Sequence, residues 1–335
     1  MNFINWGLIG FGNVVKNNLN GLPFNTENSK IYAFHQRNFN EAIKNKEKYN
    51  IDKFYSNVLD LLSDKNVNVV YICTPPGSHL EYAKLCCDYN KPAYIEKPFA
   101  RNYIEVCQII EYFKTKNVPL WVAHYKRTLP KFVQVKNIID SNAIGKIINI
   151  TYTCERPFNV SLLNHKWLYN LELSGGGRFF DIAPHFIDLL VFFFGKFELV
   201  YSIVSNHCSY HNTEDIVSFN FKTLSNVIGT ANFNFISNRR FDLMTIYGTE
   251  GNLTFSIEGG GNLTMVAKNE TKTYSFSEPL IYEKNMVNAI NAELLDNDFN
   301  NSICHGSDAI EVYRIIDLIL DNFYNGRNRD FWKNQ

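Results

Sequence analysis

Residues 1–124 alternate between short apolar runs and longer segments in which apolar positions recur at helical spacing. The apolar runs are Phe3–Ile9, Ile31–Phe34, Val67–Cys73, Ala93–Ile95 and Leu120–Ala123. Helices are predicted between them at residues 40–49, 57–62, 81–89 and 104–116. Nearly continuous apolar strands that alternate with helices are typical of a parallel sheet covered on both faces. We therefore predict a doubly wound α/β domain over residues 1–124.

The pattern changes to repeated strands after residue 147. Strands are predicted at Ile148–Cys154, Leu199–Ser205, Ile216–Phe221, Val227–Phe235, Phe241–Tyr247 and Leu253–Ile257. We expect one large, open and mostly antiparallel sheet with an aromatic-rich exposed face. Helices near residues 282–295 and 307–324 close the chain, and we expect the second of them to pack back on the first domain. Residues 125–335 are thus predicted to form an α+β domain.

A glycine turn follows the first apolar run. It reads Gly10-Phe11-Gly12-Asn13-Val14-Val15, between a predicted strand and a predicted helix. In that context Gly10 permits a tight turn, and Gly12 lets a pyrophosphate approach the backbone. Val15 stands where the dinucleotide-binding pattern has its third glycine. Other doubly wound proteins also place glycines here, so the turn favours a dinucleotide site without requiring one.

The second strand ends in His35-Gln36-Arg37-Asn38, with no acidic residue between Lys30 and Asn40. NAD sites usually place a carboxylate here to bind the ribose hydroxyls, whereas a guanidinium suits a 2′-phosphate. Gln36 and Arg37 therefore favour NADP(H), with NAD(H) as the alternative. Arg37 could instead be a solvated residue that stacks on adenine.

Three further strands of the first domain end in polar or proline-containing segments. These segments are Thr74-Pro75-Pro76-Gly77-Ser78-His79, Glu96-Lys97-Pro98 and His124-Tyr125. Ligands of doubly wound sheets bind outside the carboxyl ends of the strands. We assign Thr74, Pro75, Pro76, His79, Glu96 and Lys97 to the cofactor site.

A triple glycine at Gly175-Gly176-Gly177 precedes an apolar helical pattern that ends at Gly195. Asp181, His185 and Asp188 share one stripe of this helix. Pro184 is tolerated if the helix begins near Asp181, which places His185 about one turn inside the helix and favours its neutral, proton-accepting form. The alternatives are an N-cap role for Asp181, a structural Asp188 and a core histidine.

Composition excludes several classes of protein. Lys plus Arg and Asp plus Glu number 33 each, without a basic stripe, so we expect no nucleic-acid or anionic-membrane partner. The start of the chain lacks signal-peptide features, and the seven cysteines are scattered, as in a reduced cytoplasmic protein. His207 and His211 lack an evident third ligand, so we expect no metal.

Taken together, these segments resemble the Gfo/Idh/MocA family of nicotinamide-dependent oxidoreductases. The resemblance rests on Gly10 to Gly12, Thr74 to His79, Glu96 to Pro98, Gly145-Lys146-Ile147, Gly175 to Asp188, Phe323 to Arg327 and Asp330 to Trp332. It implies an N-terminal Rossmann domain and a catalytic set of Lys97, Asp181 and His185. Lys97 would approach the substrate oxygen, His185 would be the acid/base and Asp181 its polar companion. Val15 and Ala183-Pro184 depart from the family pattern.

The expected reaction is hydride transfer between nicotinamide and the carbinol or carbonyl carbon of a sugar, sugar derivative or polyol. Tyr125, Arg127 and Trp167 are candidates for the substrate pocket, with packing as the alternative role. Two other functions stay open: a nucleotide-sensing regulatory protein and an NAD-dependent glycosidase without net redox change. Members of the family commonly pair their C-terminal sheets, which implies a homodimer or homotetramer.

Overall fold

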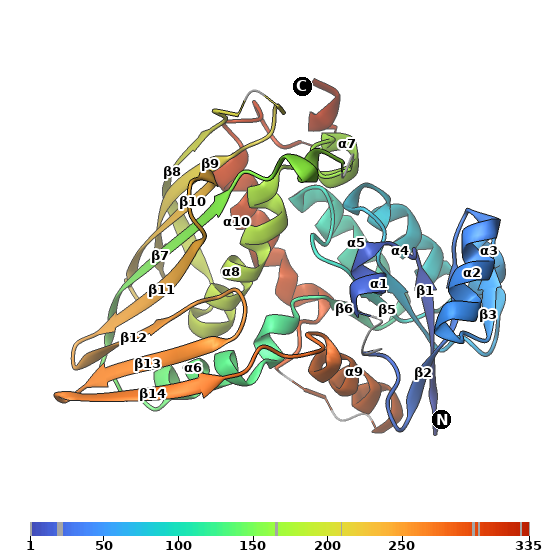
Figure 1. Cartoon of the computed structure of the whole chain (residues 1–335), viewed down its shortest axis with the longest axis horizontal. Helices are drawn as coiled ribbons and strands as arrows, with labels where there is room; N and C mark the ends of the chain where they lie inside the picture. Colours follow the sequence, from blue (N-terminus) through green and yellow to red (C-terminus); the bar gives the residue numbers. More distant parts are fainter. Residues whose placement is uncertain are drawn as a thin grey trace. The chain divides into compact units, whose positions relative to one another are not determined.

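The computed structural model describes residues 2–18, 23–164, 167–208, 210–296, 299–300, 302–328 and 330–334. The chain folds into two compact units. Unit 1 comprises residues 1–128 and 280–310, and unit 2 comprises residues 129–279 and 311–335. Each unit has a β-sheet of its own, with the elements labelled in Figure 1.

Unit 1 is built on a six-stranded sheet in the order β3-β2-β1-β4-β5-β6. The strands are β1 (Ile4–Ile9), β2 (Ser29–His35), β3 (Lys53–Tyr55), β4 (Val69–Ile72), β5 (Ala93–Ile95) and β6 (Leu120–Val122). All neighbours pair in parallel, and β4, β5 and β6 are wholly buried. This strand order is that of dinucleotide-binding doubly wound domains, so the predicted fold class of the N-terminal half is confirmed.

Helices connect successive strands of this sheet. They are α1 (Asn13–Asn18), α2 (Phe39–Tyr49), α3 (Val58–Ser63), α4 (His79–Asp88) and α5 (Tyr103–Lys116), with short turns η1 (Pro76–Ser78) and η2 (Tyr125–Thr128). An asparagine caps each end of α5. The Asn102 side chain accepts a hydrogen bond from the backbone N–H of Glu105, and Asn117 ends the helix in the left-handed conformation. Asparagine suits both positions because its side chain caps N–H groups and it tolerates positive φ.

Residues 280–310 return to unit 1 through α9 (Lys284–Asp296) and the turn η4 (Gly306–Ala309). On α9, Asn291 accepts a hydrogen bond from Trp6 Nε1 at 3.1 Å and donates to Ser29 Oγ at 2.8 Å. Trp121 Nε1 also donates to Glu293 on this helix. The first unit thus extends beyond the expected boundary at residue 124, because buried polar side chains fix a distant helix to its sheet.

Unit 2 is built on an eight-stranded sheet in the order β14-β13-β12-β11-β7-β10-β9-β8. Its strands are β7 (Ile147–Pro157), β8 (Phe197–Ser205), β9 (Ile216–Thr223), β10 (Ile228–Ser237), β11 (Phe241–Gly248), β12 (Gly251–Phe255), β13 (Gly261–Ala267) and β14 (Glu270–Phe276). Only β7 and β10 pair in parallel among these described strands. The large, mostly antiparallel sheet is confirmed.

One face of the unit 2 sheet is covered by helices, as Figure 1 shows for α6 (Pro130–Asp140), α8 (Arg178–Phe194) and α10 (Ile310–Leu320). The short elements η3 (Val160–Asn164), α7 (Leu171–Ser174) and η5 (Phe331–Asn334) complete the unit. On α8, Phe186 stacks on Tyr152 at 4.3 Å, and Phe179 packs edge-on against Phe233 at 4.9 Å. Aromatic side chains of the central strands therefore form the core beneath α8.

The expectation of an aromatic-rich open face was wrong for the central strands. Phe219 and Phe233 are buried under α8, whereas the alternate positions carry small polar residues such as Asn220, Thr230 and Asn232. Period-2 alternation assigns side chains to two faces but does not say which face the helices cover. Larger exposed apolar side chains occur on β8, β10 and β11, at Tyr201, Ile203, Ile228, Leu243 and Tyr247.

From residue 311 onward, α10 belongs to unit 2, and α9 is the late helix that packs on the first sheet. The Arg314 guanidinium donates to the carbonyl of Phe197 at 3.1 Å, and Ser202 Oγ donates to the carbonyl of Ile319 at 3.1 Å. These bonds fix α10 to β8. Over the described residues, the helices are too short or too polar to cross a lipid bilayer.

Candidate active site

The glycine turn joins β1 to α1 at the carboxyl edge of the unit 1 sheet. Gly10 has a φ of 101°, and a Cβ added there would lie only 3.0 Å from the Thr74 methyl group. A Cβ added at Gly12 would meet nothing within 4 Å, so the backbone at Gly12 is open to a close ligand. These features fit the pyrophosphate of a dinucleotide.

The side chains of this turn differ in burial. Phe11 packs into the core, with its ring 4.5 Å from that of Phe34. Asn13 begins α1, and Val14 is exposed beside the turn. Val15, which replaces the third glycine, is buried. Helix α1 therefore meets the core through a valine side chain where the dinucleotide-binding pattern usually allows direct backbone packing.

Gln36 and Arg37 follow β2 at the same edge of the sheet. The Gln36 side chain donates to Glu41 at 3.0 Å and accepts from Asn45 at 2.8 Å, so both ends of its amide are held. Arg37 is exposed. An exposed guanidinium thus follows the second strand, directly after a glutamine whose side chain is held by two hydrogen bonds.

Thr74, Pro75 and Pro76 form the loop after β4, and His79 supports that loop from within. Both His79 ring nitrogens contact backbone carbonyls, those of Thr74 at 2.7 Å and of Phe99 at 3.2 Å. Burial lowers the pKa of His79 to about 4, so the ring is neutral at physiological pH. Any effect of His79 on a cofactor would therefore pass through the Thr74 backbone.

Glu96, Lys97 and Pro98 follow β5, next to β4 in the sheet. The Lys97–Pro98 peptide bond is cis. Glu96 is buried; its Oε1 accepts from the Tyr71 hydroxyl at 2.6 Å and its Oε2 from the Lys97 backbone N–H at 2.8 Å. Burial raises the pKa of Glu96, and the positive charge of Lys97 acts against that rise. Neighbouring parallel strands thus bring Gly10, Thr74 and Lys97 to one edge of unit 1.

Two substrate candidates lie in η2, after β6. The Tyr125 ring packs 5.8 Å from that of Tyr282 and is partly exposed. Arg127 is buried, with its guanidinium 4.0 Å from the Asp308 carboxylate. Its burial and the nearby Asp308 carboxylate favour a structural role for Arg127. The ring of Tyr125, in contrast, is accessible.

Helix α8 begins at Arg178, three residues before the expected start near Asp181. Pro184 is therefore the seventh residue of the helix, where its missing N–H removes a regular backbone bond. His185 lies two turns from the helix start rather than one. The expected effect of the helix dipole on His185 is weaker at that distance, because it fades beyond the first turn.

A buried acid from a distant loop caps α8. Glu214 Oε1 accepts the backbone N–H groups of Gly177 at 2.8 Å and Phe180 at 2.9 Å, and the Tyr324 hydroxyl donates to Glu214 Oε2. Gly177 is required for this approach, since a Cβ there would lie 2.5 Å from Thr213 Oγ1. Burial raises the pKa of Glu214. Glu214 was not identified from the sequence, because it lies in a different segment from the helix it caps.

Asp181 and His185 lie one turn apart on α8, on one side of the helix. Asp181 is half-buried and forms an ion pair with Arg178 at 3.2 Å, and His185 is buried. Asp188 is fully buried on the same stripe. These side chains belong to unit 2, whereas Lys97 belongs to unit 1.

The remaining candidates lie in two loops, one before α7 and one between β8 and β9. Trp167 is partly exposed, and its carbonyl accepts the N–H of Asn170, the N-cap of α7. His211 stacks on Tyr169 at 4.2 Å and lies 3.1 Å from Thr213 Oγ1, and burial lowers its pKa. His207 is exposed in the same loop. His211 is thus part of the packing that supports the Glu214 loop.

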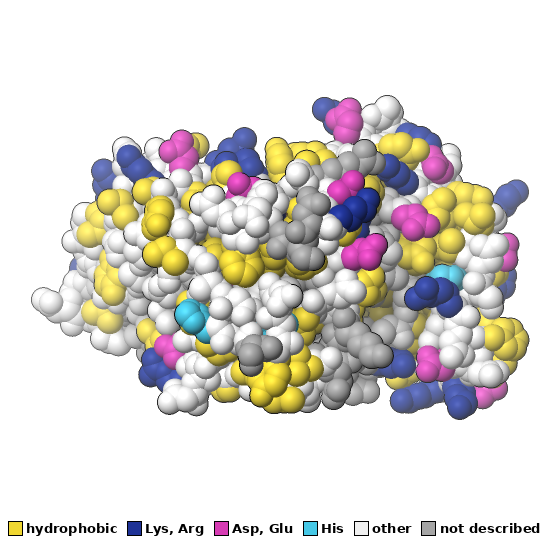
Figure 2. All heavy atoms as spheres, turned by 90° about the horizontal axis from the view of Figure 1, so that it is seen from above, with side chains coloured by type: hydrophobic (Ala, Val, Ile, Leu, Met, Phe, Trp, Pro, Cys, Tyr) yellow, Lys and Arg dark blue, Asp and Glu magenta, His cyan; other side chains and the backbone are white. Residues whose placement is uncertain are grey.

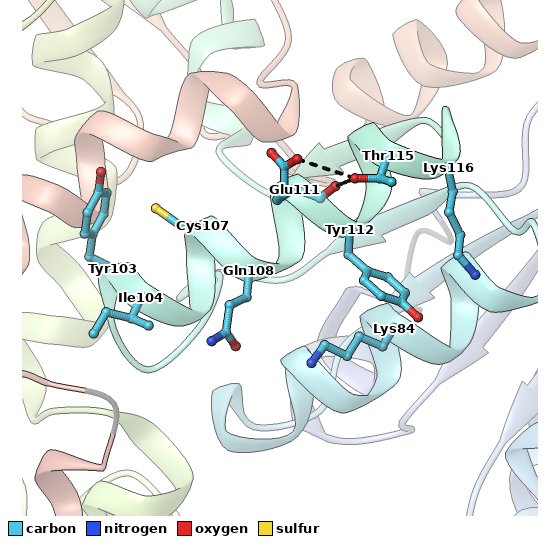
Figure 3. A pocket seen from close by; sticks show the side chains of 9 residues that line it. All are labelled: Lys84, Tyr103, Ile104, Cys107, Gln108, Glu111, Tyr112, Thr115 and Lys116. Atoms are coloured by element: carbon cyan, nitrogen blue, oxygen red, sulfur yellow. Dashed lines mark hydrogen bonds between the residues drawn. The ribbon is translucent and has the colours of Figure 1, made fainter.

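Outside this region, α5 and Lys84 of α4 line a groove of about 540 Å³ (Figure 3). Its wall includes Tyr112, whose ring centre lies 5.9 Å from Lys84 Nζ. Thr115 also lines it and donates a hydrogen bond from its hydroxyl to the backbone carbonyl of Glu111. The groove contains none of the predicted site residues. On the face shown in Figure 2, basic and acidic side chains are interspersed among the described residues.

Two family models match the chain. The oxidoreductase family model with an NAD-binding Rossmann fold matches residues 4–124, and the GFO/IDH/MocA C-terminal domain model matches residues 132–254. Oxidoreductase P35 of Formosa agariphila is 33% identical over 320 residues, which cover 94% of this chain and 98% of that protein. The similarity therefore extends through both units.

Solved structures share the fold at lower identity. A levoglucosan dehydrogenase in complex with NADH and levoglucosan aligns with a TM-score of 0.83 at 21% identity, covering 96% of this chain and 97% of that one. KijD10, a 3-ketoreductase from Actinomadura kijaniata in complex with NADP and TDP-benzene, aligns with a TM-score of 0.81 at 16% identity, covering 95% and 97%. At these identities the likeness concerns the fold.

Proposed function

Because the chain belongs to the Gfo/Idh/MocA family of oxidoreductases, we propose that it transfers a hydride between a nicotinamide cofactor and a carbinol or carbonyl carbon, with Lys97, Asp181 and His185 as its catalytic set. The observation that carries this proposal is the position of Lys97. It follows a buried parallel strand at the edge where the open Gly12 backbone also lies. Ligands of such sheets bind at this edge.

The side chains of this protein stabilise the substrate oxygen and transfer its proton. When bound, the nicotinamide supplies or accepts the hydride. The Lys97 ammonium donates a hydrogen bond to the substrate oxygen and stabilises the negative charge that develops there. The His185 imidazole gives that oxygen a proton in the direction of reduction and removes it in the direction of oxidation. Asp181 contributes a carboxylate one helical turn from His185.

We propose NADP(H) as the preferred cofactor. Arg37 is exposed at the end of β2, where a 2′-phosphate would lie, and the residues from Lys30 to Asn40 include no carboxylate to bind the ribose hydroxyls. Gly10, Phe11, Gly12, Asn13 and Val14 would hold the pyrophosphate, and Gln36 would flank the adenosine. Thr74, Pro75, Pro76 and Glu96 would line the nicotinamide side, with His79 supporting the loop.

The proposed substrate is a sugar, sugar derivative or polyol. A solved relative with the same fold holds levoglucosan together with NADH, which supports this class of ligand. Tyr125 and Trp167, both partly exposed, would contact the substrate through their rings. Arg127 is less suited to direct contact, because it is buried beside Asp308.

We also propose that a second copy of the chain covers the open face of the unit 2 sheet. Tyr201, Ile203 and Leu243 project large apolar side chains there, and exposed apolar surface of this kind favours association. We expect a homodimer or homotetramer built through this sheet.

Two measurements test the proposed function. Fluorescence titration with NADPH and NADH should show binding of both, with NADPH tighter. The preferred cofactor is then assayed with a panel of sugars, polyols and their keto derivatives. Cofactor binding without any redox change across the panel would indicate a regulatory protein. Glycoside cleavage with tightly retained cofactor and no net NADH would indicate a redox-neutral glycosidase.

A further inference from the structure

The end of β2 is tied directly to the glycine turn of unit 1. Gly10 donates its backbone N–H to the carbonyl of His35, the last residue of β2, at 3.3 Å. Gln36 follows, and its own N–H donates to the carbonyl of Tyr55 on β3 at 3.2 Å. In dinucleotide-binding domains the pyrophosphate binds at this turn and the adenosine ribose at the end of the second strand. The backbone of Gln36 is therefore fixed at the place in the fold where that ribose binds.

The side-chain amide of Gln36 is held between two residues of α2. Its Nε2 donates to Glu41 Oε2 at 3.0 Å, and its Oε1 accepts from Asn45 Nδ2 at 2.8 Å. Because an ionised carboxylate only accepts hydrogen bonds, the nitrogen of the amide must be the atom that contacts Glu41. Glu41 and Asn45 lie one helical turn apart on the same face of α2, and Asn45 is buried. The two partners together determine the orientation of the Gln36 amide.

Glu41 lies in the first turn of α2 and is exposed. Its backbone N–H donates to the side chain of Asn38, the N-cap of the helix, at 3.1 Å, while its carboxylate extends back to Gln36. Among the described residues, Gln36 is the one side chain that donates to this carboxylate, and it does so at Oε2. The other oxygen, Oε1, is therefore open to a further donor at the end of β2.

A carboxylate at the end of the second strand is the group that binds the ribose hydroxyls in NAD sites. The residues from Lys30 to Asn40 contain none, but α2 brings the carboxylate of Glu41 back to the first residue after β2. Arg37, the next residue along the chain, favours the other cofactor, because a guanidinium suits a 2′-phosphate. The end of β2 thus has one charged group for each of the two cofactors.

We propose that Glu41 is a specificity-determining residue of the cofactor site, whose carboxylate accepts a hydrogen bond from the 2′-hydroxyl of NAD(H) and repels the 2′-phosphate of NADP(H). The Gln36 amide, itself held by Asn45, keeps the carboxylate in this place. Glu41 and Arg37 act in opposite directions, so both cofactors bind and the preference for NADP(H) is smaller than Arg37 alone would give. Both roles rest on the proposed function, to the extent that the chain binds a nicotinamide dinucleotide.

Fluorescence titration of the full-length protein with NADH and with NADPH, at low and at high salt, tests the role of Glu41. Glu41→Gln removes the charge at nearly constant shape and keeps an oxygen that accepts from Gln36. This variant should bind NADPH about fivefold more tightly and NADH about fivefold more weakly, so the two Kd values move in opposite directions. The gain for NADPH should shrink at high salt, because salt screens exposed charges.

Two controls separate this role from a general effect on α2. Glu47→Gln removes the same charge from an exposed position in the last turn of the helix and should change either Kd by less than about twofold. Displacement of bound cofactor by adenosine 2′,5′-bisphosphate and by 5′-AMP should reproduce the shift seen with Glu41→Gln, because these probes differ only in the 2′-phosphate. If Glu41 merely stabilised the helix, both cofactors would lose affinity together.

The outcomes distinguish this role from the proposed function. Kd values that stay unchanged in Glu41→Gln, or that change in the same direction for both cofactors, overturn the role of Glu41, even if a substrate of the panel is turned over. If the Kd values move in opposite directions but no substrate is turned over, the role of Glu41 stands and hydride transfer fails. A wild-type protein that binds neither cofactor overturns both.

Discussion

Glu214 Oε1 lies 2.8 Å from the backbone nitrogen of Gly177, across 37 residues of sequence. Gly177 has no side chain with which to cap α8, so the first N–H groups of the helix are satisfied by an acid from the loop before β9. Unsatisfied buried N–H groups destabilise the fold. A carboxylate at a helix N-terminus also interacts favourably with the positive end of the helix dipole. The start of the helix that carries Asp181 and His185 is therefore fixed by tertiary structure.

Replacing Glu214 should destabilise the fold in a graded way. Glu214→Ala leaves two backbone N–H groups and the Tyr324 hydroxyl without their acceptor, at a cost of about 3 kcal/mol. Glu214→Gln keeps one oxygen for the N–H groups and should cost about 1 kcal/mol, as should Tyr324→Phe. Urea unfolding measures these differences. The exposed Glu198→Gln serves as the control, and an Ala variant as stable as this control would show that the cap contributes nothing.

Arg37 should set the cofactor preference. Arg37→Ala removes the guanidinium proposed to bind the 2′-phosphate and should weaken NADPH binding about tenfold, with little effect on NADH. Fluorescence titration of both cofactors gives the two Kd values. Lys44→Ala, which removes another exposed cation from α2, should change neither. Equal losses for both cofactors would assign Arg37 to adenine stacking.

His79 should make the protein less stable in mild acid. The pKa of His79 is about 4 in the folded protein and 6.5 in the unfolded chain. Between these two pH values the unfolded state therefore binds a proton at His79 that the folded state does not bind. Its contribution is fully present above pH 6.5 and is lost as the pH falls toward 4, by up to about 3 kcal/mol. Unfolding free energies of wild type and His79→Gln across this range test the effect. Parallel pH curves for the two proteins would refute it.

A charge on the open sheet face should separate the subunits. Tyr201 and Ile203 on β8 are 64% and 58% exposed, so Tyr201→Asp and Ile203→Asp should leave the fold intact while disfavouring burial against a second copy. Sedimentation velocity should show a lower mass for both variants. Leu280→Asp places the same charge at another fully exposed apolar position and should not alter the mass. A monomeric wild-type protein would remove the basis of this prediction.

Much of the fold could be predicted from local pattern. The buried strands β4, β5 and β6 are short apolar runs bounded by turns, and β10 shows clear alternation. The face that α8 covers and the return of α9 to unit 1 could not be predicted. Both depend on which distant surfaces meet, as in the bonds from Asn291 to Trp6 and Ser29.

The site divides in the same way. The positions of Gly10, Gly12 and Lys97 after buried strands could be predicted from short-range signatures. Glu214 has no such signature, since the helix start that it caps lies more than 30 residues away in the sequence. Pro184 misled the prediction of where α8 starts, because the helix tolerates it in its second turn.

A double-mutant cycle tests the proposal that Lys97 and His185 act on one substrate oxygen. For the substrate found in the panel, we measure kcat for Lys97→Met, His185→Asn and the double variant. Each single variant should lose about 10²- to 10⁴-fold, and the double variant should lose no more than about tenfold beyond the worse single. Full turnover in either single variant, or losses that multiply as for independent sites, would contradict the account.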